Sequence, residues 1–232
     1  MQEAASPRKN KRLIRIIILV FAIPFTIHLL LHFTGMLAFY TTSTTSMSPL
    51  YEPGNLVAVS NLKIPKRGDI ISYRTDSVYA GGHSGEIFLA QLIAQEGDTL
   101  EIRRSLAYVN GRLVDDSVQL KFSWARPDIS PDDYRTLKNY PETFATKDNL
   151  IVSILTEQEG KRLHLYKLIA NKGAADPMVW NGTEKNWNRD WFGPLVIPKG
   201  TVFVLGMSRH NALDSRYRGP IRTDKITGTV LR

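Results

Sequence analysis

Hydrophobic residues are distributed very unevenly along this chain. Residues 16–39 contain no Asp, Glu, Lys or Arg, whereas residues 8–15 contain five Lys and Arg residues. At about 1.5 Å per residue in a helix, the apolar run is long enough to cross a hydrocarbon core of about 30 Å. A cleaved signal peptide has a shorter apolar region, of roughly 7–15 residues. We therefore expect a transmembrane helix over residues 16–39, preceded by a basic cytoplasmic tail over residues 1–15.

The charge distribution predicts how this helix is oriented. Because Lys and Arg are enriched on the cytoplasmic side of membrane helices, the N-terminus is expected inside, and the residues after Tyr40 outside, the cytoplasm. The net charge of +8 comes from 30 Lys and Arg against 22 Asp and Glu. No basic helix or patch of interleaved basic and aromatic residues indicates nucleic acid. Anionic membrane lipid is the simpler partner, and the oligomeric state is left open.

After the apolar run, the pattern changes to short β-type segments separated by turns. Runs rich in branched apolar residues occupy 56–59, 70–74, 86–94 and 201–205. Asn110-Gly111 is a strong hairpin signal because both residues accept positive φ. From Asp115 to Arg189 the pattern weakens, with strand candidates at 150–155 and 163–169. We expect one antiparallel β domain formed by residues 40–114 and 190–232, with residues 115–189 inserted as a cap subdomain.

Composition excludes several classes of chemistry. The chain has no cysteine, so disulfides, thiolate metal sites and a cysteine nucleophile are all excluded. Its five histidines are scattered, and no glycine-rich loop stands at a strand-to-helix junction. We therefore expect neither a metal nor a cofactor.

The stretch directly after the apolar run is Thr44-Thr45-Ser46-Met47-Ser48-Pro49-Leu50. Taken alone, it is typical of a polar loop that leaves a membrane anchor. Three further motifs come after it along the chain: Arg67-Gly68-Asp69-Ile70-Ile71, a strand that ends in Gly97-Asp98, and a C-terminal block from Gly206 to Pro220. That block includes Leu213-Asp214-Ser215-Arg216 and Gly219-Pro220.

This series of motifs resembles the type I signal peptidases, membrane-bound Ser–Lys proteases that remove signal peptides from exported proteins. The resemblance covers residues 40–110 and 192–232 well and the insert hardly at all. It implies a mainly β, antiparallel, barrel-like fold with one N-terminal transmembrane helix. The partners it implies are the signal peptides of preproteins.

The resemblance also implies roles for individual residues. Ser46 would be the nucleophile, and Thr44 falls where the family has a hydroxyl residue that helps to bind the oxyanion. Met47, Phe88 and Leu89 would contact the substrate near the small residue at the cleavage site. A further set, Asp214, Ser215 and Arg216, matches a segment that supports the site rather than reacts.

The sequence departs from the family at the general base. Alignment of Gly97-Asp98 with the end of the family's Lys-Arg-x-x-Gly-x-Pro-Gly-Asp motif places Ala90 where the family has its catalytic lysine. Ala212 likewise replaces a serine that holds the lysine. Further changes lie at Ala94, Glu96, Met207 and Ser208. A serine hydroxyl needs a base near neutral pH, and alanine cannot supply one.

Two explanations are compatible with this departure. Another residue supplies the base, His83 and His210 being the candidates, or the domain keeps its groove and serves as a peptide-binding accessory factor in export or surface assembly. A third hypothesis is a self-cleaving repressor-type Ser–Lys protease. That hypothesis requires an Ala-Gly or Cys-Gly bond before the serine, and residues 1–45 contain neither pair.

Overall fold

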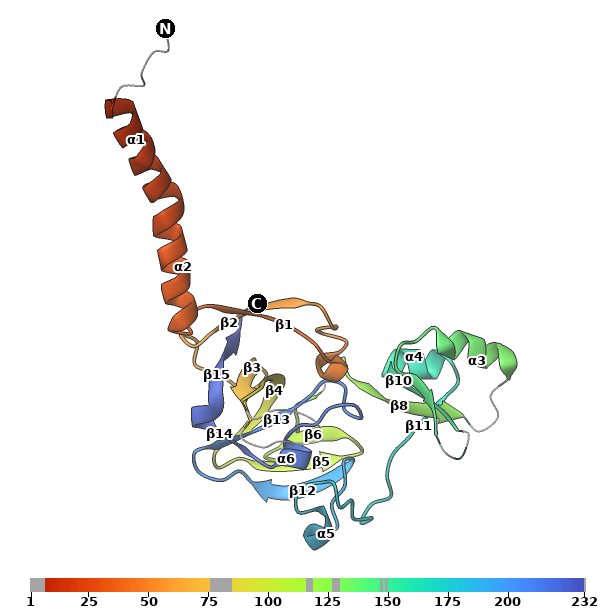
Figure 1. The fold of residues 1–232 in the computed structure, drawn as a ribbon. Helices are drawn as coiled ribbons and strands as arrows, with labels where there is room; N and C mark the ends of the chain where they lie inside the picture. The colour runs from red at the N-terminus through yellow and green to blue at the C-terminus, as the bar shows by residue number, and fades with distance from the viewer. Residues whose placement is uncertain are drawn as a thin grey trace.

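An N-terminal helix projects away from a β-rich body in the computed structural model (Figure 1). The structure describes residues 7–75, 85–115, 119–126, 130–146, 148 and 150–231. The helix comprises α1 (Pro7–Ile17), a single π turn (η1, Ile18–Ala22) and α2 (Ile23–Phe33). In the π turn the Ile23 N–H reaches back to the Ile18 carbonyl, just before Pro24, which has no N–H to donate.

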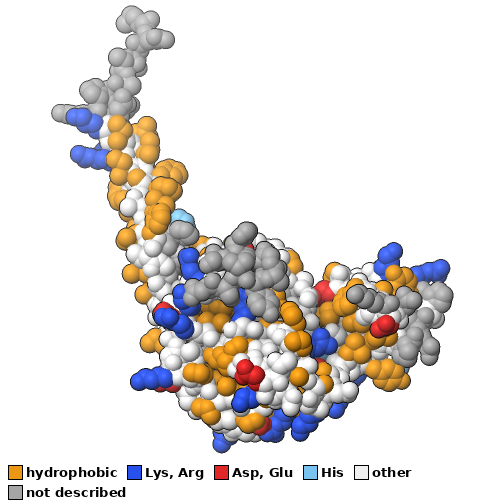
Figure 2. All heavy atoms as spheres, turned by 60° about the horizontal axis from the view of Figure 1, so that its bottom comes forward, with side chains coloured by type: hydrophobic (Ala, Val, Ile, Leu, Met, Phe, Trp, Pro, Cys, Tyr) orange, Lys and Arg blue, Asp and Glu red, His pale blue; other side chains and the backbone are white. Residues whose placement is uncertain are grey.

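The helix is apolar over most of its length. Figure 2 shows hydrophobic side chains along it and Lys and Arg near its N-terminal end. Residues 11–31 form one helix long and apolar enough to cross a membrane, judged by length and composition. It ends at Phe33, earlier than the expected Phe39. Gly35 adopts a positive φ of 71°, a conformation that terminates helices, and the chain then enters a strand.

The body is mainly antiparallel β-structure, as the sequence predicted. A seven-stranded sheet has the order β1-β2-β15-β3-β4-β13-β14, and all of its pairings are antiparallel. Its strands are β1 (Ala38–Thr41), β2 (Leu56–Ser60), β3 (Ile70–Arg74), β4 (Ile87–Gln95), β13 (Thr201–Leu205), β14 (Ile221–Arg222) and β15 (Ile226–Val230). The sheet thus joins strands from both ends of the chain. A 3₁₀ turn, η3 (Thr223–Lys225), connects β14 to β15.

A second sheet continues the body. It has four strands in the order β12-β5-β6-β7, namely β5 (Thr99–Arg103), β6 (Leu106–Val109), β7 (Arg112–Leu113) and β12 (Trp191–Val196). The Asn110-Gly111 turn joins β6 to β7, as expected, with both residues at positive φ. Buried apolar side chains of β4, β5, β6, β12 and β13 share one core cluster, so the two sheets form one packed unit.

A separate lobe lies beside this body (Figure 1). Its sheet has the order β11-β8-β10-β9, with strands β8 (Lys121–Arg126), β9 (Thr143–Ala145), β10 (Ile151–Thr156) and β11 (Tyr166–Lys167). The helices α3 (Pro131–Lys138) and α4 (Glu157–Arg162) accompany them, and α5 (Gly182–Lys185) lies on the way back to the body. All of these elements come from residues 115–189.

The prediction of a strand over residues 163–169 in the lobe is mostly wrong. Residues 163–169 contribute only Tyr166 and Lys167 to a strand. A capping box between Thr156 and Glu159 starts α4 directly after β10, and Leu163 caps its end. The chain then turns at His164, whose φ is 54°.

Candidate active site

Ser46 lies in a short 3₁₀ turn, η2 (Thr45–Met47), between β1 and β2. The Met47 side chain is 2% exposed and packs in the core beside Val57 and Val59. The Ser46 carbonyl accepts a hydrogen bond of 3.0 Å from the Ser208 N–H. The turn is therefore held in place by the packing of Met47 in the core and by the hydrogen bond from Ser208 of the C-terminal block.

The Ser46 hydroxyl is partly exposed and has a hydroxyl neighbour. The Oγ atom of Ser46 lies 2.9 Å from Thr44 Oγ1, and either atom can be the donor. In the first turn of a helix the N–H groups have no acceptor within the helix, which leaves such groups available to an external oxygen. The structure thus places the Ser46 and Thr44 hydroxyls side by side.

Gly206 packs directly against the Ser46 turn. A Cβ atom at this position would lie 2.3 Å from the Ala212 Cβ atom and 2.8 Å from the Ser46 carbonyl oxygen. Gly206, the first residue of the C-terminal block, is therefore required because any side chain would collide with Ala212 and the Ser46 carbonyl. Its φ is not in the left-handed region, so backbone conformation does not require glycine here. The contact also shows that Ala212 lies next to Ser46.

In the part of the chain that the structure describes, one edge of β4 beside Ser46 has no strand partner. Residues 87–90 pair with β3 on one side, whereas β13 pairs with β4 only from Gln91 onward. A hollow of about 390 Å³, which we call the strand groove, lies between residues 40–44 and residues 86–89, and Ser46 and Met47 also line it. Phe88 and Leu89 thus line a hollow that reaches Ser46, where a substrate segment is expected.

A second hollow meets the first at Ser46. This Arg218 pocket has a volume of about 510 Å³ and contains Ser46, Ala90, Ala212 and Arg218 among its lining residues. Within the described residues, no Lys or His nitrogen is hydrogen-bonded to Ser46 Oγ. His83, one of the two histidines considered as the base, lies outside the described residues.

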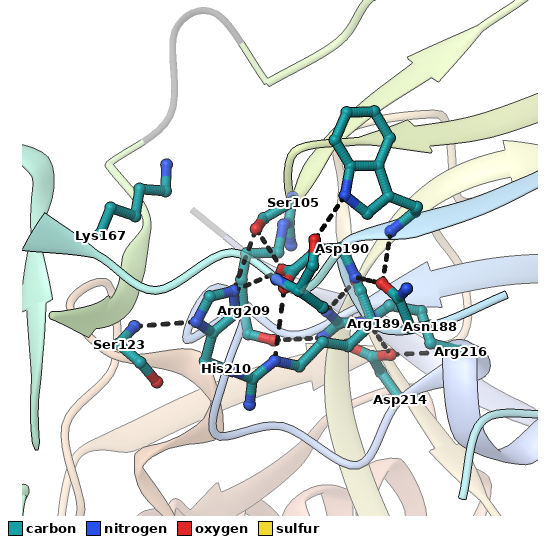
Figure 3. A network of polar contacts seen from close by, with 12 residues as sticks. Ser105, Ser123, Lys167, Asn188, Arg189, Asp190, Arg209, His210, Asp214 and Arg216 are labelled. Carbon is teal, nitrogen blue, oxygen red and sulfur yellow. Dashed lines mark hydrogen bonds and ion pairs between the residues drawn. The ribbon is translucent and has the colours of Figure 1, made fainter. Parts of the chain in front are cut away.

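His210, the other histidine considered, is not placed to act as the base. Its ring is fully buried, and the Ser123 backbone N–H donates to Nδ1 at 2.9 Å. The Nε2 atom therefore carries the proton and donates to Asp190 Oδ1 at 2.7 Å (Figure 3). Ser105 Oγ also contacts both Asp190 and Nε2. Although His210 lines the same pocket as Ser46, both of its nitrogens are hydrogen-bonded to other groups, so it is part of a structural network.

Burial and hydrogen bonding determine the protonation states of His210 and Asp190. Burial lowers the pKa of His210 to about 4, although Asp190 opposes the shift. Burial would raise the pKa of Asp190, but hydrogen bonds from His210, the Ala170 N–H and Ser105 lower it overall. A neutral imidazole and an ionised carboxylate are therefore expected at neutral pH.

The lowered pKa of His210 makes stability depend on pH. Between its ordinary value of about 6.5 and its folded value of about 4, the unfolded chain binds more protons than the folded one. The free energy of unfolding should thus be fully retained above pH 6.5 and fall by up to about 3 kcal/mol as pH drops to 4. Urea denaturation at pH 7 and pH 4.5 measures this loss. The His210→Gln variant should show a smaller loss, and an equal loss in both proteins would contradict the assignment.

Asp214 is the N-cap residue of α6 (Ser215–Arg218), and Ser215 and Arg216 are the first residues of this helix. Hydrogen bonds of all three side chains hold the C-terminal block in its conformation. Asp214 accepts from the fully buried Arg216 side chain at 2.8 and 2.9 Å, and from the Gly206 N–H at 3.0 Å. Ser215 Oγ accepts from the Val204 N–H where the register of β13 shifts. Figure 3 shows Asp214 beside Arg216. The hydrogen bond from the Gly206 N–H to Asp214 holds Gly206 in place against the Ser46 carbonyl.

The lobe is linked to the Ser46 turn through Asn211, a contact that the sequence did not predict. Asn211 Nδ2 donates to Thr45 Oγ1 at 3.0 Å and to Glu142 Oε1 at 2.7 Å. Glu142 also pairs with Lys121 at 3.2 Å. A second ion pair connects the residue at which the lobe begins, Asp115, with Arg209 of the C-terminal block. The two buried side chains are 2.6 Å apart. Only the folded chain brings these distant residues together.

Comparison with known proteins agrees on one family. The sequence profile of the family described as signal peptidase, peptidase S26, matches residues 11–232. A signal peptidase I of Aquifex aeolicus is 26% identical over 204 residues, covering 82% of this chain and 72% of that protein. Signal peptidase I T of Bacillus subtilis is 26% identical over 192 residues, covering 82% and 69%. A crystal structure of a signal peptidase I from Enterococcus faecalis is 22% identical and covers 73% of this chain and 98% of that one, with a TM-score of 0.35.

Proposed function

Because this chain belongs to the peptidase S26 family of signal peptidases, we propose that Ser46 is the nucleophile of a membrane-anchored serine endopeptidase of the signal peptidase I type. Proteins of this family act on the signal peptides of preproteins at the membrane. The observation that carries the assignment is the position of the Ser46 hydroxyl. It is partly exposed, next to Thr44, where the strand groove and the Arg218 pocket meet.

The strand groove suits an extended peptide. Within the described residues, no strand pairs with residues 87–90 on the side that faces residues 40–44. A peptide that enters as an added strand would form main-chain hydrogen bonds with this edge, and its alternate side chains would contact Phe88, Leu89 and Met47. This arrangement presents the scissile carbonyl to Ser46 Oγ. The Ser46 N–H and the Thr44 hydroxyl are the donors that we assign to the oxyanion, in the manner of preorganised oxyanion sites.

Removal of the proton from the Ser46 hydroxyl is the step of the proposed reaction that lacks an identified side-chain base. Thr44 is itself a hydroxyl and cannot serve as a base, and within the described residues no Lys or His nitrogen is hydrogen-bonded to Ser46 Oγ, so in our proposal the proton passes to water. A positioned side-chain base contributes about 10²–10⁴-fold to such steps. Turnover should therefore be slower, by about that factor, than in relatives that have the lysine.

The membrane arrangement is inferred from the helix. We place the N-terminus in the cytoplasm and residues 40–232 on the opposite side of the membrane, since the basic residues precede the apolar segment. The same basic segment is expected to contact anionic lipid headgroups. In this arrangement the catalytic body lies next to the lipid surface, where signal peptides emerge.

Replacement of the nucleophile gives the direct test. Purified full-length protein in detergent should slowly cleave a preprotein that bears a small-x-small site, and Ser46→Ala should abolish this cleavage because no other hydroxyl occupies its place. Gel analysis and mass spectrometry of the new N-terminus measure the product. Thr136→Ala, which removes a hydroxyl bonded within α3, is the matched control and should cleave normally. Cleavage that survives Ser46→Ala, or wild-type protein that binds the preprotein without cutting it, would refute the proposal.

A further inference from the structure

Arg218, at the end of α6, is a half-buried cation without an anionic partner in the described part of the chain. Its Nε and Nη1 atoms are buried and have no hydrogen-bond acceptor there, and the side chain forms no ion pair there. Its Cζ atom lies 4.3 Å from the centre of the Phe88 ring. The side chain lines the same pocket as Ser46 and Ala90.

This arrangement is costly unless something else binds the guanidinium. Burial of charged donors without acceptors is unfavourable, and a cation–π contact with one ring offsets only part of the cost. Two carboxylates line the same pocket. Asp214 is engaged by Arg216 and the Gly206 N–H, while Asp176 accepts from the Met178 N–H and does not pair with Arg218. The pocket thus holds donors that no group of the described chain satisfies.

We propose that Arg218 binds the carboxylate of an Asp or Glu side chain in the first two residues after the scissile bond of the substrate. The inference rests on the proposed function, because it takes the residues before the bond to lie in the strand groove. The Arg218 pocket shares Ser46 with the strand groove and extends along Ala212–Asp214 and Tyr217, which do not line that groove, so we take the chain that continues past the reacting carbonyl to enter it. Arg218 is then a specificity-determining residue of the mature side of the substrate.

The chemistry of arginine favours a carboxylate ligand. The guanidinium stays protonated in proteins, which excludes a role as general base, and its planar donors match a carboxylate with two parallel hydrogen bonds. Stacking on Phe88 holds the plane of the guanidinium in place before the ligand arrives, which reduces the entropy lost on binding.

Peptide binding tests the inference separately from cleavage. Fluorescent peptides that span a small-x-small site, with Asp or Asn at the first or second position after the scissile bond, are titrated against full-length Ser46→Ala protein in detergent micelles. The Asp peptide should bind about tenfold or more tightly than its Asn counterpart at one of these positions. Arg218→Met should remove this preference while retaining affinity for the Asn peptide. Arg222→Met, which removes an exposed arginine paired with Asp224, is the control and should keep the preference.

Four outcomes would overturn the inference. Equal affinity for Asp and Asn peptides at both positions, or a preference that persists in Arg218→Met, would show that Arg218 does not bind the carboxylate. A lower melting temperature of Arg218→Met with weaker binding of both peptides would indicate a structural role, since replacement of an unpaired buried charge by methionine should leave stability equal or higher. If no peptide binds the parent protein, the strand groove itself is refuted, and the inference fails with it.

Discussion

Cleavage of preproteins should become about 10²–10⁴-fold faster when Ala90 is replaced by lysine. Ala90 is 2% exposed on β4 and lines the pocket that Ser46, Ala212 and Gly206 also line. The pocket volume of about 510 Å³ leaves room for a longer side chain. A lysine here would be desolvated by apolar neighbours and close to the Arg218 cation. Both effects lower the pKa of an amine, so a fraction of it would be neutral and able to accept the Ser46 proton.

Three variants make this prediction specific. Ala90→Met supplies a side chain of similar length without an amine and should give no gain. Ala90→Lys combined with Ala212→Ser adds a hydroxyl beside the amine and should increase the rate further. Ala90→Lys combined with Ser46→Ala should be inactive. A folded Ala90→Lys protein that binds the preprotein but cleaves it no faster than wild type would show that the site has lost more than its base.

The pH profile gives a second readout of the same variant. Because only the neutral amine accepts a proton, the rate of Ala90→Lys should rise with pH and level off above the pKa of the introduced lysine. The Met variant lacks this titrating group, so it should show no corresponding inflection.

The sequence was sufficient to predict the elements that depend on local pattern. The apolar helix, the strands that became β3, β4 and β13, and the Asn110-Gly111 hairpin can all be derived from short-range periodicity and turn chemistry. The approach of Ser46 to Thr44 is equally local, because the two residues belong to one turn. The nearness of Ala90 to Ser46 came from the family resemblance and not from any pattern in the residues.

The properties that depend on distant residues could not be predicted. His210 looks like a candidate base in the sequence, but Ser123 and Asp190, both remote in the chain, occupy its two nitrogens. Arg218 looks like an ordinary surface residue, and only the packing of its side chain against Phe88 reveals that its Nε and Nη1 atoms are buried. Burial and partner choice are set by tertiary contacts that a linear pattern does not contain.

Loss of the Asp214 carboxylate is expected to destabilise the fold strongly. Asp214→Ala leaves the fully buried Arg216 without its counter-ion, and removal of one partner from a buried ion pair typically costs about 3–5 kcal/mol. Urea denaturation of the full-length protein in detergent measures the change. Asp132→Ala, which removes an exposed partner of Arg135, is the control and should have little effect because surface pairs contribute little.

The double variant Asp214→Ala, Arg216→Met separates the unpaired charge from other effects. It removes the buried cation together with its partner, so it should recover part of the stability that Asp214→Ala loses. Its cleavage of the preprotein should nevertheless remain below wild type, because the Gly206 N–H still lacks its acceptor and Gly206 supports the Ser46 turn. Recovery of both stability and cleavage would mean that Asp214 serves only to neutralise Arg216. No recovery of stability would instead assign the loss to the backbone hydrogen bonds of Asp214.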